Sequence, residues 1–203
     1  MSTPNTIRDD ITYMRQLAEQ GRNAPILGGA FLTCAGVIFG VACFVQWAMT
    51  LRGVQGSLAT LGLWGGATGL FALVWLVLFL QMRARGPAAT GISNKSFSAA
   101  WLSAGIGYTV ASIGVAIAAV MSHSPSAMLV YPPMLFGYYG TAWLVAGILV
   151  QRSWMLAAAA VAYLFVIILA FLSMQAWLLP AMGIALLLTL SIPGILLMRE
   201  KAL

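Results

Sequence analysis

Six long apolar stretches fill most of this chain, and none of them contains an Asp, Glu, Lys, Arg or His. Each is long enough to cross a bilayer as a helix, which takes about 20 apolar residues. The sequence therefore predicts an all-α polytopic membrane protein in which residues 26–198 form a bundle of six transmembrane helices. The predicted spans are residues 26–49, 58–81, 98–121, 128–150, 154–173 and 177–198.

The basic residues are distributed in a way that predicts the orientation of the bundle. Three precede the first span, three lie between the second and third, one lies between the fourth and fifth, and two follow the last, so nine of the ten are on one side. The positive-inside rule makes that side cytoplasmic, with both termini inside. All four acids lie on the same side. We therefore interpret the net charge of +6 as a topological signal and expect no binding to nucleic acid.

The polar segment before the first span, residues 1–25, has the pattern of an amphipathic helix. Ile7, Ile11, Met14 and Leu17 recur at helical spacing and define one apolar face. Such a helix lies along the inner leaflet or against the cytoplasmic loops, or it docks a cytoplasmic partner. Residues 199–203 would form a short cytoplasmic tail.

Small residues recur at spacings of four or seven within several spans, which places them on one face of each helix. In membranes such faces allow close approach of helix backbones, where burial of apolar surface cannot drive association. We expect these faces to be used inside the bundle or between copies of the chain. The glycines that define them are Gly36, Gly40, Gly62, Gly66, Gly107, Gly140 and Gly147.

Hydroxyl side chains gather near the middle of spans two to six. If they face inward together, they form an uncharged polar belt at the depth where transporters place substrate sites. Alternatively, threonines bond to the carbonyl four residues earlier and tyrosines bond across helices, as in many membrane bundles. The residues are Thr68, Tyr108, Thr109, Tyr138, Tyr139, Thr141, Tyr163 and Thr189.

Three prolines have a predicted effect on helix geometry. Pro132 and Pro133 are expected to lie in the first turn of the fourth span, where proline is favoured. Pro193 lies well inside the sixth span, where it removes a backbone hydrogen bond, so a bend is expected there.

Several residue patterns that catalysis requires are missing from the sequence. The single histidine, His123, lies in an outer loop, which excludes a bis-histidine haem within the bundle. No carboxylate lies within a span to couple transport to protons or sodium. Neither a nucleophile elbow nor a glycine-rich phosphate loop is present. We therefore predict that the protein is not an enzyme and holds no cofactor or metal.

Residues 22–30 (RNAPILGGA) and 135–143 (LFGYYGTAW) carry a resemblance to small, uncharacterised six-span inner-membrane proteins of Gram-negative bacteria. The resemblance implies a bacterial inner-membrane location and supplies no activity. The lack of ionisable groups within the spans, the small-residue faces and the predicted helix at the inner surface lead us to expect a non-enzymatic accessory, scaffolding or regulatory subunit of a membrane assembly. Its expected partners are membrane lipid and either copies of itself or other membrane proteins. The alternative is an uncoupled carrier or channel for a neutral or lipidic small molecule.

Overall fold

The computed structural model describes residues 12, 28–54, 56–84 and 92–199, and this part of the chain is helical with connecting turns. Six of its helical spans are long and apolar enough to cross a membrane, which confirms the predicted all-α architecture. The predicted amphipathic helix and the tail at residues 199–203 lie almost wholly outside the described residues. The elements are α2 (Gly29–Leu51), α3 (Ser57–Ala84), α4 (Ile92–Met121), η2 (Pro125–Val130), α5 (Tyr131–Val150), α6 (Ser153–Leu172), α7 (Leu178–Leu186), η3 (Leu187–Ser191) and α8 (Ile192–Arg199).

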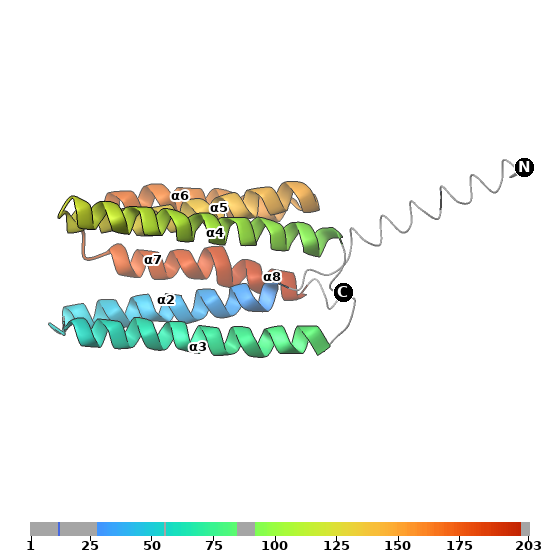
Figure 1. The fold of residues 1–203 in the computed structure, drawn as a ribbon. Coiled ribbons are helices and arrows are strands. Elements are labelled where there is room, and N and C mark those ends of the chain that lie inside the picture. Colours follow the sequence, from blue (N-terminus) through green and yellow to red (C-terminus); the bar gives the residue numbers. More distant parts are fainter. Residues whose placement is uncertain (1–11, 13–27, 55, 85–91, 200–203) are drawn as a thin grey trace, which may run out of the picture.

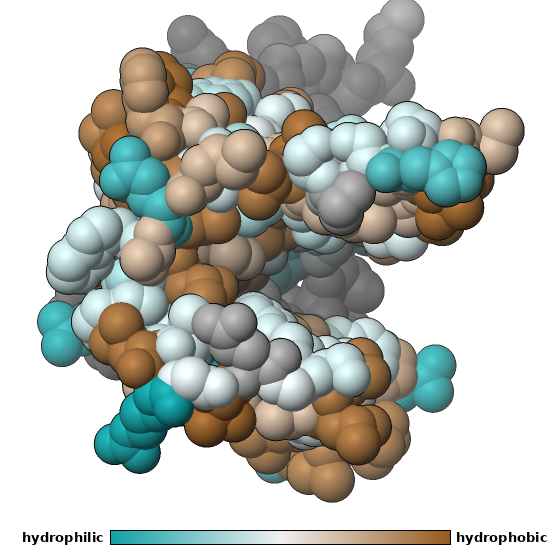
Figure 2. All heavy atoms as spheres, turned by 90° about the vertical axis from the view of Figure 1, so that its left-hand side faces the viewer, coloured by the Kyte–Doolittle hydropathy of each residue, from teal (hydrophilic) through white to brown (hydrophobic). Residues whose placement is uncertain are grey.

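The helices form two groups joined by the last span. Helix α5 packs against α4 and α6, and helix α2 packs against α3. The last span, which runs through α7, η3 and α8, lies between these groups and contacts α2 along its length (Figure 1). We call the two groups the α2–α3 half and the α4–α6 half. Seen end-on, the surface is hollowed on one side between the lobes that the two halves build (Figure 2).

Large apolar side chains from α5, α6 and the last span form the core. Phe136, Trp143, Met155 and Leu169 are fully buried there. Trp143 is also the centre of an aromatic cluster. Its ring centroid lies 5.9 Å from that of Phe97, 5.2 Å from that of Trp101 and 5.7 Å from that of Trp154. Such ring pairs add to the energy of burial, so α5 is held firmly against α4 and α6.

The fourth span begins where its prolines predict. A 3-10 helix, η2, leads into α5, and Pro132 and Pro133 lie in the first turn of α5. Proline is tolerated there because the first N–H groups of a helix have no partner within it. At the other end of α5, Gln151 adopts a left-handed conformation with φ of 60°. This residue ends the helix and lets α6 return antiparallel after a very short connection.

The last span is not a regular α-helix. Residues Leu187–Ser191 form a π-helical segment, and α8 follows directly with Pro193 as its second residue. Single-turn π segments are uncommon and often occur where a helix has a special role. The sequence predicts a bend at Pro193, and the structure has a π-helical segment immediately before this residue.

Candidate functional site

Five of the seven glycines singled out from the sequence lie in close contacts within the chain. On α2, a Cβ added at Gly36 would lie 2.8 Å from the backbone nitrogen of Ser191, and one at Gly40 would lie 3.3 Å from the carbonyl oxygen of Gly183. On α4 and α5, Gly107 faces Tyr138, Gly140 faces Tyr163, and Gly147 faces Leu156 and Met155. These positions accept no larger residue without a shift of their neighbours.

Two further glycines, which are not among those seven, bring the backbones of α2 and α8 close together. A Cβ at Gly29 would lie 2.6 Å from the carbonyl oxygen of Gly194, and a Cβ at Gly194 would lie 2.6 Å from that of Gly29. Gly183 makes a similar approach to the backbone of Gly40. Small residues therefore line the whole contact between α2 and the last span. The signal was present in the sequence, but Gly183 and Gly194 are eleven residues apart and do not follow the spacing of four or seven.

The other two glycines, Gly62 and Gly66 on α3, have open space beside them. A Cβ added at either would meet nothing within 4 Å, and the same holds for Gly65 and Gly69. Helix α3 packs chiefly against α2, and none of the residues in its most apolar stretch is buried. By contrast, half of the corresponding residues in the last span are buried. The small-residue face of α3 is thus vacant within the described part of the chain.

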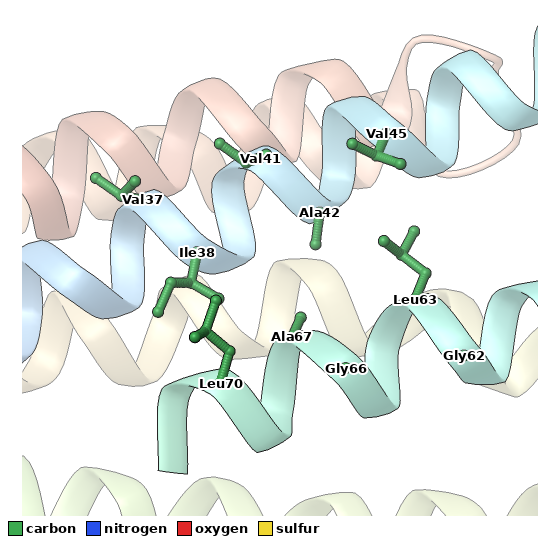
Figure 3. A pocket seen from close by; sticks show the side chains of 10 residues that line it. All are labelled: Val37, Ile38, Val41, Ala42, Val45, Gly62, Leu63, Gly66, Ala67 and Leu70. Carbon is green, nitrogen blue, oxygen red and sulfur yellow. The ribbon is translucent and has the colours of Figure 1, made fainter. Parts of the chain in front are cut away.

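A groove of about 460 Å³ runs between α2 and α3 beside this vacant face. Figure 3 shows Ile38 and Ala42 pointing from α2 toward α3, with Leu63, Ala67 and Leu70 pointing back. Its lining is almost entirely apolar. The complete lining is Val37, Ile38, Val41, Ala42, Val45, Gly62, Leu63, Gly66, Ala67 and Leu70. Such a surface can fit another helix closely, backbone to backbone, and it presents no chemically reactive group.

Three of the eight hydroxyl residues meet in a second groove, between α5 and α6. Tyr138, Thr141 and Tyr163 line it together with apolar side chains, and its volume is about 520 Å³. The Thr141 hydroxyl donates to the carbonyl oxygen of Gly137 at 3.0 Å and lies 3.1 Å from the Tyr163 hydroxyl. With the Thr141 proton donated to Gly137, the Tyr163 hydroxyl donates to Thr141. The two hydroxyls thus satisfy each other within the chain.

The remaining five hydroxyl residues lie elsewhere. Tyr108 packs edge-on against Tyr138 between α4 and α5, with ring centroids 6.1 Å apart, whereas Tyr139 packs against Trp101. Thr189 is fully buried. Thr68 and Thr109 are exposed on the outer helices α3 and α4. The two tyrosines and the threonine needed for a carrier, Tyr108, Tyr163 and Thr189, therefore lie at three different places in the bundle.

The threonines mostly follow the local pattern expected for membrane helices. Thr109, Thr141 and Thr189 each donate to the carbonyl oxygen four residues earlier, at 2.8, 3.0 and 2.7 Å. This bond satisfies the hydroxyl proton within the helix itself. In the described part of the chain the hydroxyl residues thus divide between local hydrogen bonds and helix contacts.

A hydrogen bond that the sequence analysis missed links α5 to the last span. The indole nitrogen of Trp143 donates to the backbone carbonyl oxygen of Thr189 at 2.8 Å, and both residues are fully buried. In a regular helix this carbonyl would accept from the N–H of residue 193, which is a proline and has none. The position of Trp143 deep within its span does not reveal from the sequence which carbonyl the indole reaches.

No metal or acid–base centre emerges from the described residues. Within them, no group of three His, Cys, Asp or Glu side chains is close enough to hold a metal ion. Three buried polar atoms there have no hydrogen-bond partner, namely Gln46 Oε1, Trp101 Nε1 and Ser112 Oγ. Gln46 is on α2, and Trp101 and Ser112 are about 16 Å apart along α4. These atoms do not converge on one site.

The most distinctive surface of the described chain is therefore the vacant face of α3 with the adjoining groove on α2. Comparison with protein-family models, with curated proteins and with solved structures finds no match for this chain.

Proposed function

We propose that this protein is a non-enzymatic accessory or scaffolding subunit that docks a transmembrane helix of another subunit, or of a second copy, on α3. One observation carries the proposal: α3 is a membrane-length helix that packs chiefly on α2 and leaves its glycines open in the described part of the chain. In the rest of the described bundle, neighbouring helices contact Gly36, Gly40, Gly107, Gly140 and Gly147, whereas Gly105 and Gly114 on α4 also have open space. The glycine face of α3 is similar in composition to these contact faces, but no helix in the described part of the chain packs on it.

The physics of association in lipid supports this role. Exposed apolar surface does not drive helices together in hydrocarbon, because lipid tails are equally apolar. Close backbone approach at small residues does drive them together, through dispersion contacts. At Gly62 and Gly66, which line the groove, a second helix can approach the backbone of α3 closely. The leucine-rich remainder of α3 is suited to contact with lipid.

The arrangement of the hydroxyl residues favours binding over transport. A carrier would need Tyr108, Tyr163 and Thr189 around one cavity that opens to either side of the membrane. Instead, Tyr163 lines a groove at the α5–α6 surface, Tyr108 packs between α4 and α5, and Thr189 is sealed beneath Trp143. A scaffold needs no such cavity.

The mass of the extracted protein tests this function. The single chain has a mass of 21.5 kDa. After gentle extraction into lipid nanodiscs at low detergent, we expect light scattering to report a protein mass of at least two chains, or of this chain with a larger partner. A lone monomer with no co-purifying protein, at the concentration found in the membrane, would leave the scaffold role without support.

We also propose a bacterial inner-membrane location with both termini in the cytoplasm. The N-terminal end of α2 and the C-terminal end of α8 lie at the same end of the bundle (Figure 1). Arg83, whose guanidinium lies 5.2 Å from the Phe79 ring centroid, and Arg199 are at the ends of their helices on that side. The excess of positive charge favours the cytoplasm.

A reporter enzyme fused in the connection between α4 and α5 tests this orientation. With the fusion at Ser124, alkaline phosphatase is expected to be active and a green fluorescent reporter dark, because the connection is external. A fusion after Arg199 should give the reverse pattern and serves as the control. A cytoplasmic signal from Ser124 would overturn the orientation.

A further inference from the structure

The last span is the joint between the two halves of the molecule. Its segments α7, η3 and α8 all contact α2, while α7 and η3 also contact α6. The π-helical segment η3 lies in the middle of this joint, directly before Pro193. A helix interrupted in this way is easier to bend than a continuous one, because part of its backbone hydrogen bonding is missing.

The missing hydrogen bond is replaced from the α4–α6 half. Pro193 cannot donate to Thr189, and the Trp143 indole donates to that carbonyl oxygen at 2.8 Å instead. The Thr189 hydroxyl is already bonded to the carbonyl oxygen of Ala185 at 2.7 Å. In the surrounding hydrocarbon no water is available as an alternative donor. Trp143 thus supplies a donor to a carbonyl that Pro193 leaves without its α-helical one.

The position of Trp143 is itself fixed by its neighbours. Phe97 and Trp101 of α4 and Trp154 of α6 surround its ring, with centroids 5.2 to 5.9 Å away. The indole nitrogen therefore points at Thr189 only while α4, α5 and α6 keep their mutual packing. The bond between Trp143 and Thr189 joins this rigid aromatic cluster to the most irregular point of the last span.

We propose that Trp143 is a latch that holds the joint in one shape and so sets the position of the α2–α3 half relative to the α4–α6 half. With the bond formed, the last span is rigid and the hollow between the two lobes (Figure 2) has one width. With the bond broken, the span bends at η3 and the halves move against each other. The inference concerns shape within one chain, so it stands or falls independently of what docks on α3.

A distance measurement between the halves tests the latch. Spin labels are placed on non-canonical residues at Leu61 of α3 and Val120 of α4, both exposed on the surface. Cys34 and Cys43 then remain unchanged. The full-length protein in nanodiscs is expected to give one narrow distance distribution. Trp143→Phe, which keeps the aromatic ring and removes the N–H, is expected to broaden it clearly.

The decisive comparison uses Pro193→Ala, which supplies a backbone N–H for the Thr189 carbonyl. In the double variant Trp143→Phe with Pro193→Ala, the distribution of spin-label distances is expected to narrow again. Trp143→Phe alone should raise the rate of amide hydrogen exchange at residues 189–194 about tenfold. In the double variant this rate should return toward that of the wild type. If Trp143→Phe leaves the distribution of spin-label distances unchanged, the proposed role of Trp143 is wrong.

A double variant as broad as Trp143→Phe would also overturn it, because Trp143 would then act through ring packing alone. If Trp143→Phe does not fold, comparing it with the double variant still shows whether the hydrogen bond to Thr189 matters. Recovery of folded protein in the double variant supports the latch, and continued failure to fold contradicts it.

Discussion

Gly194→Leu is expected to prevent the protein from folding into a stable bundle. Even a Cβ at this position would lie 2.6 Å from the carbonyl oxygen of Gly29 and 2.7 Å from the backbone nitrogen of Thr33. These are backbone atoms of α2 and cannot rotate away as a side-chain end can. Separating α2 from α8 would break the contact that holds the α2–α3 half to the last span. Overpacking of this kind costs about 3 kcal/mol or more.

The measurement is the yield of monodisperse protein in mild detergent, followed by its thermal unfolding midpoint. Gly114→Leu is the matched control, because it makes the same chemical change at a glycine of α4 with nothing within 4 Å of an added Cβ and lies outside the proposed docking face. The control should express and unfold like the wild type. Equal yields and midpoints for the two variants would show that α2 and α8 do not meet closely at Gly29 and Gly194.

The combined change Gly62→Leu and Gly66→Leu is expected to abolish assembly while leaving the single chain folded. The added side chains would stand on the vacant face of α3 and keep a docking helix from close backbone approach. Loss of that approach should weaken association by at least about tenfold, equivalent to 1.4 kcal/mol. Native mass spectrometry of the protein in nanodiscs reports the fraction of chain in the larger assembly.

The helical spans could be predicted closely from the sequence because bilayer thickness and apolar length are directly linked. The predicted span 154–173 is α6 at Ser153–Leu172, and 58–81 lies within α3 at Ser57–Ala84. Helix α4 begins earlier than its predicted start, at Ile92. The predicted span begins only at residue 98, so the polar first turn of α4, with Lys95, lies outside it. Helix ends outside the apolar region follow local backbone bonding, which hydropathy does not report.

The use of each small-residue face could not be predicted, because it depends on how each helix is rotated about its axis. Gly36 on α2 and Gly66 on α3 have similar sequence surroundings, yet the first touches the backbone near Ser191 and the second faces open space. In a soluble helix, polar residues mark the outer face. Here lipid-facing and protein-facing residues are both apolar, so composition does not distinguish them.

The hydroxyl residues show a similar limit. Tyr138 and Tyr139 are adjacent and point in different directions, so the first lines the α5–α6 groove and the second packs on Trp101. Thr189 is reached by a tryptophan 46 residues away in the chain. Pro193 predicted that a carbonyl would lose its donor, but only the packing of α5 against the last span shows which side chain replaces it.

The docking role of α3 is tested most directly by the fraction of chain found in a larger assembly. This fraction is compared between three proteins: the wild type, the double variant Gly62→Leu and Gly66→Leu, and the single variant Gly114→Leu. Gly114 on α4 also has nothing within 4 Å of an added Cβ, so it controls for adding leucine to a lipid-facing helix. All three proteins are prepared in the same nanodiscs from the same membranes. The docking role predicts a larger assembly for the wild type and Gly114→Leu, and a single 21.5 kDa chain for the double variant. An assembly that survives both α3 changes, or a wild type that is already a single chain, would contradict it.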